Sequence, residues 1–245
     1  MTLDAVKTPP KARPGKHDPA VVFRTPPLEP GDRLTRREFE RRYQAMPHIK
    51  KAELIEGVVY MPSPVHASHA AAHSQIIGWL AVYAASTPGV KLADNATVRL
   101  DLDNEPQPDA VMFLDPSRGG QVRISDDGYI EGAPELVAEV SSSTVSIDLH
   151  SKFRVYRRSQ AREYLVWRVQ DRALDWFVLR EGDYQRLTPG GDGMLRSEVF
   201  PGLWLDPAAL LRGDLAAVLQ VLQQGLQTPA HAAFVADWKE QRLSD

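Results

Sequence analysis

Two acidic residues in strand-like stretches carry the most chemical information in this sequence. Asp109 lies in the run EPQPDAVMF, and Glu139 lies in PELVAEVSSST. A carboxylate among apolar neighbours in a strand is costly to bury unless a metal ion or a cationic partner compensates its charge. Lys152, on a helix expected to follow, can supply such a cation. These three groups together predict a metal-dependent phosphodiesterase.

The reaction that this set of residues could perform is hydrolysis of a phosphodiester. A divalent cation held by Asp109 and Glu139 would neutralise charge on the phosphate, and Lys152 would position or polarise the attacking water. Two alternatives compete with this hypothesis. Asp109 could be a turn residue, because Pro-Asp pairs are common in turns. Lys152 could form an ordinary surface pair with Asp148, worth roughly 0.3–0.5 kcal/mol.

Other titratable residues are weaker candidates for the same site. Glu53 and Glu56 compete for the role of an upstream acid, and either could instead be a charge at a strand edge. His69 and His73 lie four residues apart on one helix face and could bind a metal. A surface position or a hydrogen-bonded interior position is the commoner explanation for such histidines.

Size and composition indicate one catalytic domain with extensions. The chain has 245 residues, of which 43% are hydrophobic and 25% are charged. No apolar run approaches the roughly 20 residues that span a bilayer, and the N-terminus has no hydrophobic signal core, so a cytoplasmic protein is expected. The sequence contains no cysteine. Oxygen and imidazole ligands therefore remain for any metal, which favours Mg²⁺ or Mn²⁺.

The charge balance argues against a protein that grips long nucleic acid over a wide surface. The net charge is -3, whereas such proteins are usually strongly basic. A nuclease can still use a local basic strip. One candidate strip, which could equally be a solvated helix face, consists of Lys152, Arg154, Arg157, Arg158 and Arg162.

The hydrophobic pattern predicts an ordered core between two extensions. Residues 1–30 are rich in proline and lysine and are expected to be a disordered arm that is dispensable for folding. Residues 31–212 are predicted to form the core domain, and residues 213–245 a C-terminal helical extension. Helices are predicted over 34–43, 66–85 and 215–226, and a hairpin is predicted in AELIEGVVYM with its turn at Glu56-Gly57.

The segment from Val90 to Leu179 reads mainly as strands. The predicted strands are KLADNATVRLDLD, DAVMFL, ELVAEVSS, EYLVWRV and RALDWFVLR. A helix with Leu149, Phe153 and Tyr156 on its apolar side separates the third strand from the fourth, which predicts a parallel pair joined by a crossover. The fold class expected is therefore α/β, with a mixed sheet flanked by helices and antiparallel hairpins.

These segments resemble one known family. AELIEGVVYMPSP, the histidine-bearing helix, EPQPDAVMF, APELVAEVSSST, the helix from Asp148 to Tyr156 and REYLVWRV are similar, in this order, to the Uma2 family of the PD-(D/E)XK nuclease superfamily. The resemblance covers roughly residues 34 to 210. It implies a restriction-endonuclease-like core, with Asp109 as the superfamily aspartate, Glu139 at the (D/E) position and Glu53 as the upstream acid.

The chain departs from the superfamily pattern at one position. Ser141 occupies the place, two residues after Glu139, where the superfamily has a lysine. The resemblance implies that this lysine has migrated to the following helix, where Lys152 matches it. The implied function is a Mg²⁺- or Mn²⁺-dependent endodeoxyribonuclease acting on DNA as a homodimer. The alternatives are a non-catalytic dimeric nucleic-acid-binding or regulatory protein on the same fold, and a metal-dependent hydrolase of another phosphoester.

Overall fold

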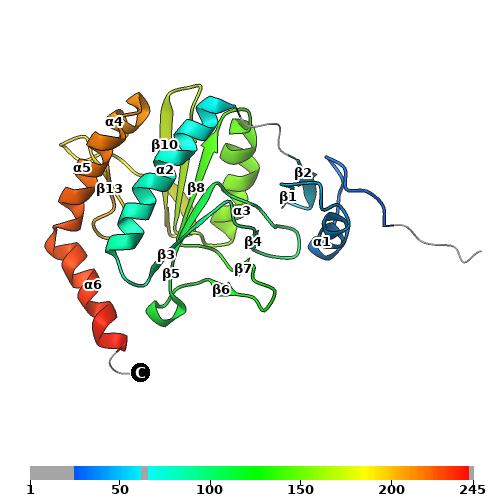
Figure 1. Ribbon diagram of the computed structural model, residues 1–245, viewed down its shortest axis with the longest axis horizontal. Coiled ribbons are helices and arrows are strands. Elements are labelled where there is room, and N and C mark those ends of the chain that lie inside the picture. Colours follow the sequence, from blue (N-terminus) through cyan, green and yellow to red (C-terminus); the bar gives the residue numbers. More distant parts are fainter. Residues whose placement is uncertain (1–24, 62–65, 243–245) are drawn as a thin grey trace, which may run out of the picture.

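The computed structural model describes residues 25–61 and 66–242, and it begins with a small N-terminal unit. Helix α1 (Arg36–Gln44) lies beside a hairpin made of β1 (Glu53–Ile55) and β2 (Val58–Tyr60). Figure 1 shows this unit set to one side of the main sheet. The hairpin turns at Glu56 and Gly57, whose φ angles of 52° and 73° are both left-handed, as a two-residue turn of this kind requires. The predicted hairpin is confirmed.

The centre of the molecule is a six-stranded mixed sheet with the order β11-β10-β9-β8-β5-β3. Strands β8 and β9 are parallel, and the other neighbours are antiparallel. The strands are β3 (Val90–Asp94), β5 (Ala110–Leu114), β8 (Leu136–Ser141), β9 (Glu163–Arg168), β10 (Ala173–Arg180) and β11 (Asp183–Arg186). The sequence-based prediction of a mixed sheet with one parallel crossover pair is confirmed.

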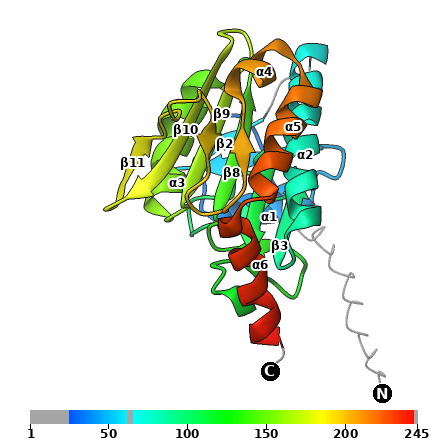
Figure 2. The same cartoon turned by 90° about the vertical axis from the view of Figure 1, so that its left-hand side faces the viewer.

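Helices cover both faces of this sheet. On one face, alternate residues of β8, such as Leu136 and Ala138, pack in a core with α2 (Ala67–Ser86) and α5 (Leu215–Leu226). Figure 2 shows α2 and α5 lying alongside one another. On the other face, Val137 packs in a separate core that includes Tyr156 and Tyr164. Because successive strand residues point to opposite faces, Glu139 shares the face of Val137.

The crossover between β8 and β9 covers the second face. It consists of a π-helical segment, η2 (Ile147–Lys152), that continues directly into α3 (Phe153–Arg158). The sequence predicted a helix here but not its wider first part. Short π-helical segments are rare in proteins, and those that occur often lie at functional sites. This one carries Asp148 and Lys152, both of which are buried.

The predicted strand after α2 is divided in the structure. Asn95 adopts a left-handed φ of 50° after β3, and the chain leaves the main sheet there. It then forms β4 (Val98–Arg99) of a second sheet with the order β4-β7-β6. The remaining elements of this region are η1 (Pro116–Arg118), β6 (Arg123–Ile124) and β7 (Ile130–Glu131).

The first helix after residue 213 packs on the main core. Val218 and Leu222 of α5 are fully buried against α2 and the sheet. The apolar face of α5 could not have been assigned to this core without knowing that α2 lies next to it. The other elements here are β12 (Leu195–Arg196), β13 (Trp204–Leu205), α4 (Pro207–Arg212) and α6 (Pro229–Arg242). None of the helices in the described ranges is long and apolar enough to cross a membrane.

The boundary of the N-terminal arm differs from the expectation. Residues 1–24 of the predicted arm lie outside the described residues. Leu28, inside the predicted arm, is only 2% exposed and packs in the small core of the N-terminal unit with Phe39 and Leu54. A leucine flanked by prolines and charges gave no periodic pattern, so its burial was not predicted. The folded unit therefore includes residues that the sequence assigned to the arm.

Leu28→Ala is expected to destabilise the protein by about 2 kcal/mol or more, because it removes a fully buried leucine side chain. Urea denaturation followed by tryptophan fluorescence measures this change. Glu29→Ala is the matched control, since Glu29 is exposed and adjacent. Equal stabilities of the two variants would show that Leu28 does not contribute to the folded unit.

Candidate active site

The two acidic residues singled out in the sequence lie next to one another at one end of the β5–β8 pair. Ala110 of β5 pairs with Ala138 of β8, and continuing this antiparallel register by one residue places Asp109 opposite Glu139. The backbone N–H of Val140 donates a 2.7 Å hydrogen bond to Asp109 Oδ2. Both acids are buried, at 6% and 3% exposure. The strand pairing therefore brings together two residues that are thirty positions apart.

Lys152 reaches the same place from the π-helical segment. Its Nζ lies 3.0 Å from Glu139 Oε1 and 2.9 Å from Glu53 Oε1, and 3.6 Å from Asp148 Oδ1. Burial disfavours the ammonium, but the attraction of Glu139, Glu53 and Asp148 outweighs this and raises the pKa of Lys152 well above its usual value. Lys152 is therefore charged and bridges the N-terminal hairpin, β8 and η2.

The surface-pair alternative for Asp148 and Lys152 is wrong, because both side chains are buried. Asp148 Oδ2 accepts hydrogen bonds from the hydroxyls of Thr144, at 2.6 Å, and Ser141. Ser141 thus orients Asp148 beside Lys152. The hydroxyl of Tyr156, on α3, donates a 3.1 Å hydrogen bond to Glu139 Oε1, the oxygen that also contacts Lys152.

Negative charge exceeds positive charge around Glu139. Burial raises the pKa of Glu139; the Lys152 ammonium lowers it, while the carboxylates of Asp148, Asp109 and Glu53 raise it again. A single lysine therefore does not fully compensate the acids that surround it. A site of this kind favours either a bound proton or an additional cation.

Asp109 has its own cationic partners. Lys51 Nζ lies 3.7 Å from Oδ1, and His69 Nε2 lies 3.6 Å from Oδ2. Burial opposes ionisation of Asp109, but the interaction with His69, the charge of Lys51 and the Val140 N–H outweigh it and lower its pKa to about 2. Asp109 is thus a stably ionised carboxylate and not merely a turn residue.

Lys51 and His69 are the residues of this site that the local sequence pattern did not predict, since a surface position is the commoner explanation for a histidine such as His69. The signal for Lys51 was its position two residues before Glu53, since side chains at that spacing leave an extended chain on the same side. The structure places His69 half-buried against Asp109. His73 has another role: its Nε2 lies 3.0 Å from the backbone oxygen of Asp109 and 3.0 Å from Asp94 Oδ1. It thereby ties α2 to the start of β5.

The donor set is suited to a hard divalent cation. Asp109 Oδ1 and Glu139 Oε2 accept no hydrogen bond from any residue in the described ranges, and carboxylate oxygens are the ligands that Mg²⁺ and Mn²⁺ prefer. Within the same ranges no group of three or more His, Asp or Glu residues has the geometry of a complete metal site. Mg²⁺ is commonly held by one or two carboxylates, with water and phosphate oxygens completing its shell. The residues present therefore fit such an ion.

Two expectations about surrounding charges change with the structure. Glu53 is the acid that joins the site, whereas Glu56 points outward and pairs with Arg154 at 2.7 Å. The candidate basic strip is largely neutralised, because Arg157 also pairs with Asp183, and Lys152 is buried. Lys152, Arg154 and Arg157 of the strip are therefore already paired with carboxylates, whereas Arg162 is exposed.

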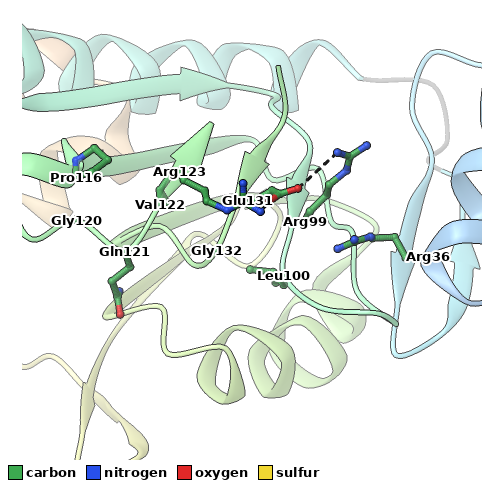
Figure 3. Close-up of a pocket in the computed structure, with 10 residues that line it drawn as sticks. All are labelled: Arg36, Arg99, Leu100, Pro116, Gly120, Gln121, Val122, Arg123, Glu131 and Gly132. Carbon is green, nitrogen blue, oxygen red and sulfur yellow. Dashed lines mark ion pairs between the residues drawn. The ribbon is translucent and has the colours of Figure 1, made fainter. Parts of the chain in front are cut away.

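A hollow elsewhere on the molecule has no residue in common with this site. Figure 3 shows it on the side of the small sheet, with a volume of about 530 Å³ and with Arg36, Arg99, Arg123 and Glu131 in its lining. Its charges are already matched: Arg99 donates to Asp127 at 2.9 Å and lies 3.7 Å from Glu131, which also pairs with Arg123. The hollow therefore offers no unpaired charge comparable to the carboxylate cluster at Asp109 and Glu139.

The mixed sheet, the crossover helix and the acids at the sheet end define a protein with a restriction-endonuclease-like fold. A solved structure described as "a putative nuclease belonging to DUF820 from Anabaena variabilis" superposes with a TM-score of 0.56, covering 71% of this chain and 97% of that chain at 13% sequence identity. The Uma2 family model, described as "Putative restriction endonuclease", matches residues 36–208. The chain belongs to the Uma2 family, which confirms the resemblance found in the sequence. No curated protein sequence matches it.

Lys152→Ala is expected to destabilise the protein by about 3–5 kcal/mol, because it leaves buried carboxylates without their cation. Adding Glu139→Gln to this variant should recover part of the loss, since it removes one of the opposing charges. Chemical denaturation of the single and double variants at neutral pH measures both effects.

Lys91→Ala is the control for loss of a lysine ion pair. Lys91 contacts Asp115 at 2.9 Å but its side chain is 51% exposed, so its removal should cost less than about 1 kcal/mol. If Lys152→Ala were no more destabilising than Lys91→Ala, the buried cluster would not depend on Lys152.

Proposed function

We propose that this protein is a metal-dependent endodeoxyribonuclease that hydrolyses phosphodiester bonds in DNA. The observation that carries the proposal is the convergence of Asp109, Glu139, Glu53 and Lys152 from separate elements on one buried site. Membership of the Uma2 family supports nuclease chemistry over other uses of the fold. Fold alone would not, because one fold serves many functions.

Asp109 and Glu139 are the proposed ligands of Mg²⁺ or Mn²⁺. When bound, such an ion neutralises charge on the phosphate oxygens and the leaving group. Asp109 is held for this role by the Val140 N–H, and Glu139 is held by Tyr156 and Lys152. Glu53 completes the acidic set, and its Oε1 is fixed by the backbone N–H of Gln107 at 2.7 Å. The chain thus orients each carboxylate before substrate arrives.

The cost of the buried cluster favours an enzyme over a binding scaffold. Burying an ion pair is often no more stabilising than well-packed apolar residues of similar volume. A protein that used this fold only to bind nucleic acid would have no need for a glutamate at 3% exposure in the middle of β8. Perturbed, closely spaced titratable groups are typical of catalytic sites.

A homodimer is part of the proposal, because two copies of the site would let each act on one strand of a duplex. The overall charge of -3 indicates that contact with DNA is local, around the site, since long-range attraction to a polyanion is weak for an acidic protein. Binding is therefore expected to be modest in affinity and sensitive to salt.

In the presence of Mg²⁺ or Mn²⁺ the protein should nick or cleave plasmid DNA, and Asp109→Asn or Glu139→Gln should each lower the rate by about 10²-fold or more. The double variant should be little worse than either single variant, since the two carboxylates act on one ion. Supercoiled plasmid relaxation with and without chelator measures these rates.

Asp192→Asn is the matched control, because Asp192 is an exposed carboxylate that pairs with Arg196 outside the site. It should cleave at the wild-type rate. The scaffold alternative would be established by two results together. The wild-type protein would cleave no form of DNA with either metal, and it would bind DNA as a dimer with an affinity that the Asp109 and Glu139 variants leave unchanged.

A further inference from the structure

The lysine expected to act on the substrate is buried and held by two short contacts to carboxylates. An ammonium has three N–H donors. Lys152 Nζ lies within 3.0 Å of oxygens of Glu53 and Glu139, and its remaining side faces Asp148 Oδ1 at 3.6 Å. Its side chain is only 5% exposed. To contact a phosphate, Lys152 would have to leave Glu53 and Glu139, which pair with no other cationic side chain within residues 25–61 and 66–242.

Lys51 lies at the same acids but in a different environment. Its Nζ is 3.7 Å from Asp109 Oδ1, a distance that gives electrostatic attraction without a hydrogen bond, and its side chain is 22% exposed. Within residues 25–61 and 66–242 it donates to no other group. Its donors are therefore available to an incoming anion.

The local chain holds Lys51 toward the site. Ala52 and Leu54 are buried in the core of the N-terminal unit, so the side chains that alternate with them, Lys51 and Glu53, leave on the opposite side. Glu53 reaches Lys152 on that side. The same short segment thus supplies one acid to the buried cluster and one lysine beside Asp109.

We propose that Lys51 is the catalytic lysine that contacts the scissile phosphate, and that Lys152 is a positioning residue that holds Glu53, Glu139 and Asp148. This inference rests on the proposed nuclease function. Contacting the phosphate and holding the carboxylates, both expected of one superfamily lysine, are thereby divided between Lys51 and Lys152. Lys51 donates to a phosphate oxygen and offsets the negative charge that develops there, while the buried Lys152 stays with its carboxylates.

Lys51→Ala tests this assignment, with Lys50→Ala as the control because Lys50 is the adjacent, exposed lysine. In single-turnover cleavage of a DNA duplex with Mn²⁺, Lys51→Ala should lower the rate by about 10²-fold or more. Lys50→Ala should cleave at the wild-type rate, and Lys51→Arg should keep part of the activity because it keeps the charge. Lys51→Ala should keep the wild-type melting temperature.

Binding to the same duplex in Ca²⁺, measured by fluorescence anisotropy over a range of salt concentrations, gives a readout that does not require cleavage. Loss of one phosphate contact should lower the dependence of log K on log salt by about 1 in Lys51→Ala and leave it unchanged in Lys50→Ala. Wild-type protein that cleaves no DNA would contradict the proposed function. The slope would then show only whether Lys51 contacts a phosphate.

Three results would overturn the role of Lys51. The first is cleavage by Lys51→Ala at the rate of Lys50→Ala. The second, should the wild type be inactive, is an equal salt dependence for the two variants. The third is a fall in the melting temperature of Lys51→Ala as large as that of Lys152→Ala, which would assign Lys51 a structural role.

Discussion

The ammonium of Lys152 among the carboxylates of Glu53, Glu139 and Asp148 is the interaction on which the arrangement of the site depends. It joins the N-terminal hairpin, the central strand β8 and the π-helical segment η2. Each carboxylate would be costly to bury alone, and together they would repel one another. The lysine makes their close approach possible. The acids nevertheless still exceed the cations around Glu139, and this excess suits the site to a divalent ion.

The alternation of side chains along β8 makes this interaction possible. Leu136 and Ala138 face α2 and α5, whereas Val137 and Glu139 face the crossover. A register shift of one residue would put Glu139 into the apolar core. Hydrogen bonds along the β5–β8 ladder and the Val140 N–H to Asp109 contact oppose such a shift. The sheet therefore determines both the position of the acids and the face to which they point.

The sequence was most informative where one residue was anomalous in its local pattern. The helix between two apolar strands was enough to predict the parallel pair and its crossover. Glu139, an acid in a Val/Leu-rich strand, marked the position of the site. Contacts between distant segments were not predictable in the same way. The burial of Leu28, the packing of α5 on α2 and the approach of Lys51 and His69 to Asp109 all depend on tertiary neighbours that no local spacing reveals. The π-helical geometry of η2 likewise has no sequence signal that we could identify.

The most direct test of the account is the position of Mn²⁺ in crystals of the protein soaked with that ion, located by its anomalous scattering. We expect a peak shared by Asp109 and Glu139, with one oxygen of each at about 2.0–2.6 Å, while Lys152 remains on Glu53 and Glu139. A peak at other residues only, or a fully soaked crystal with no peak between the two carboxylates, would contradict it.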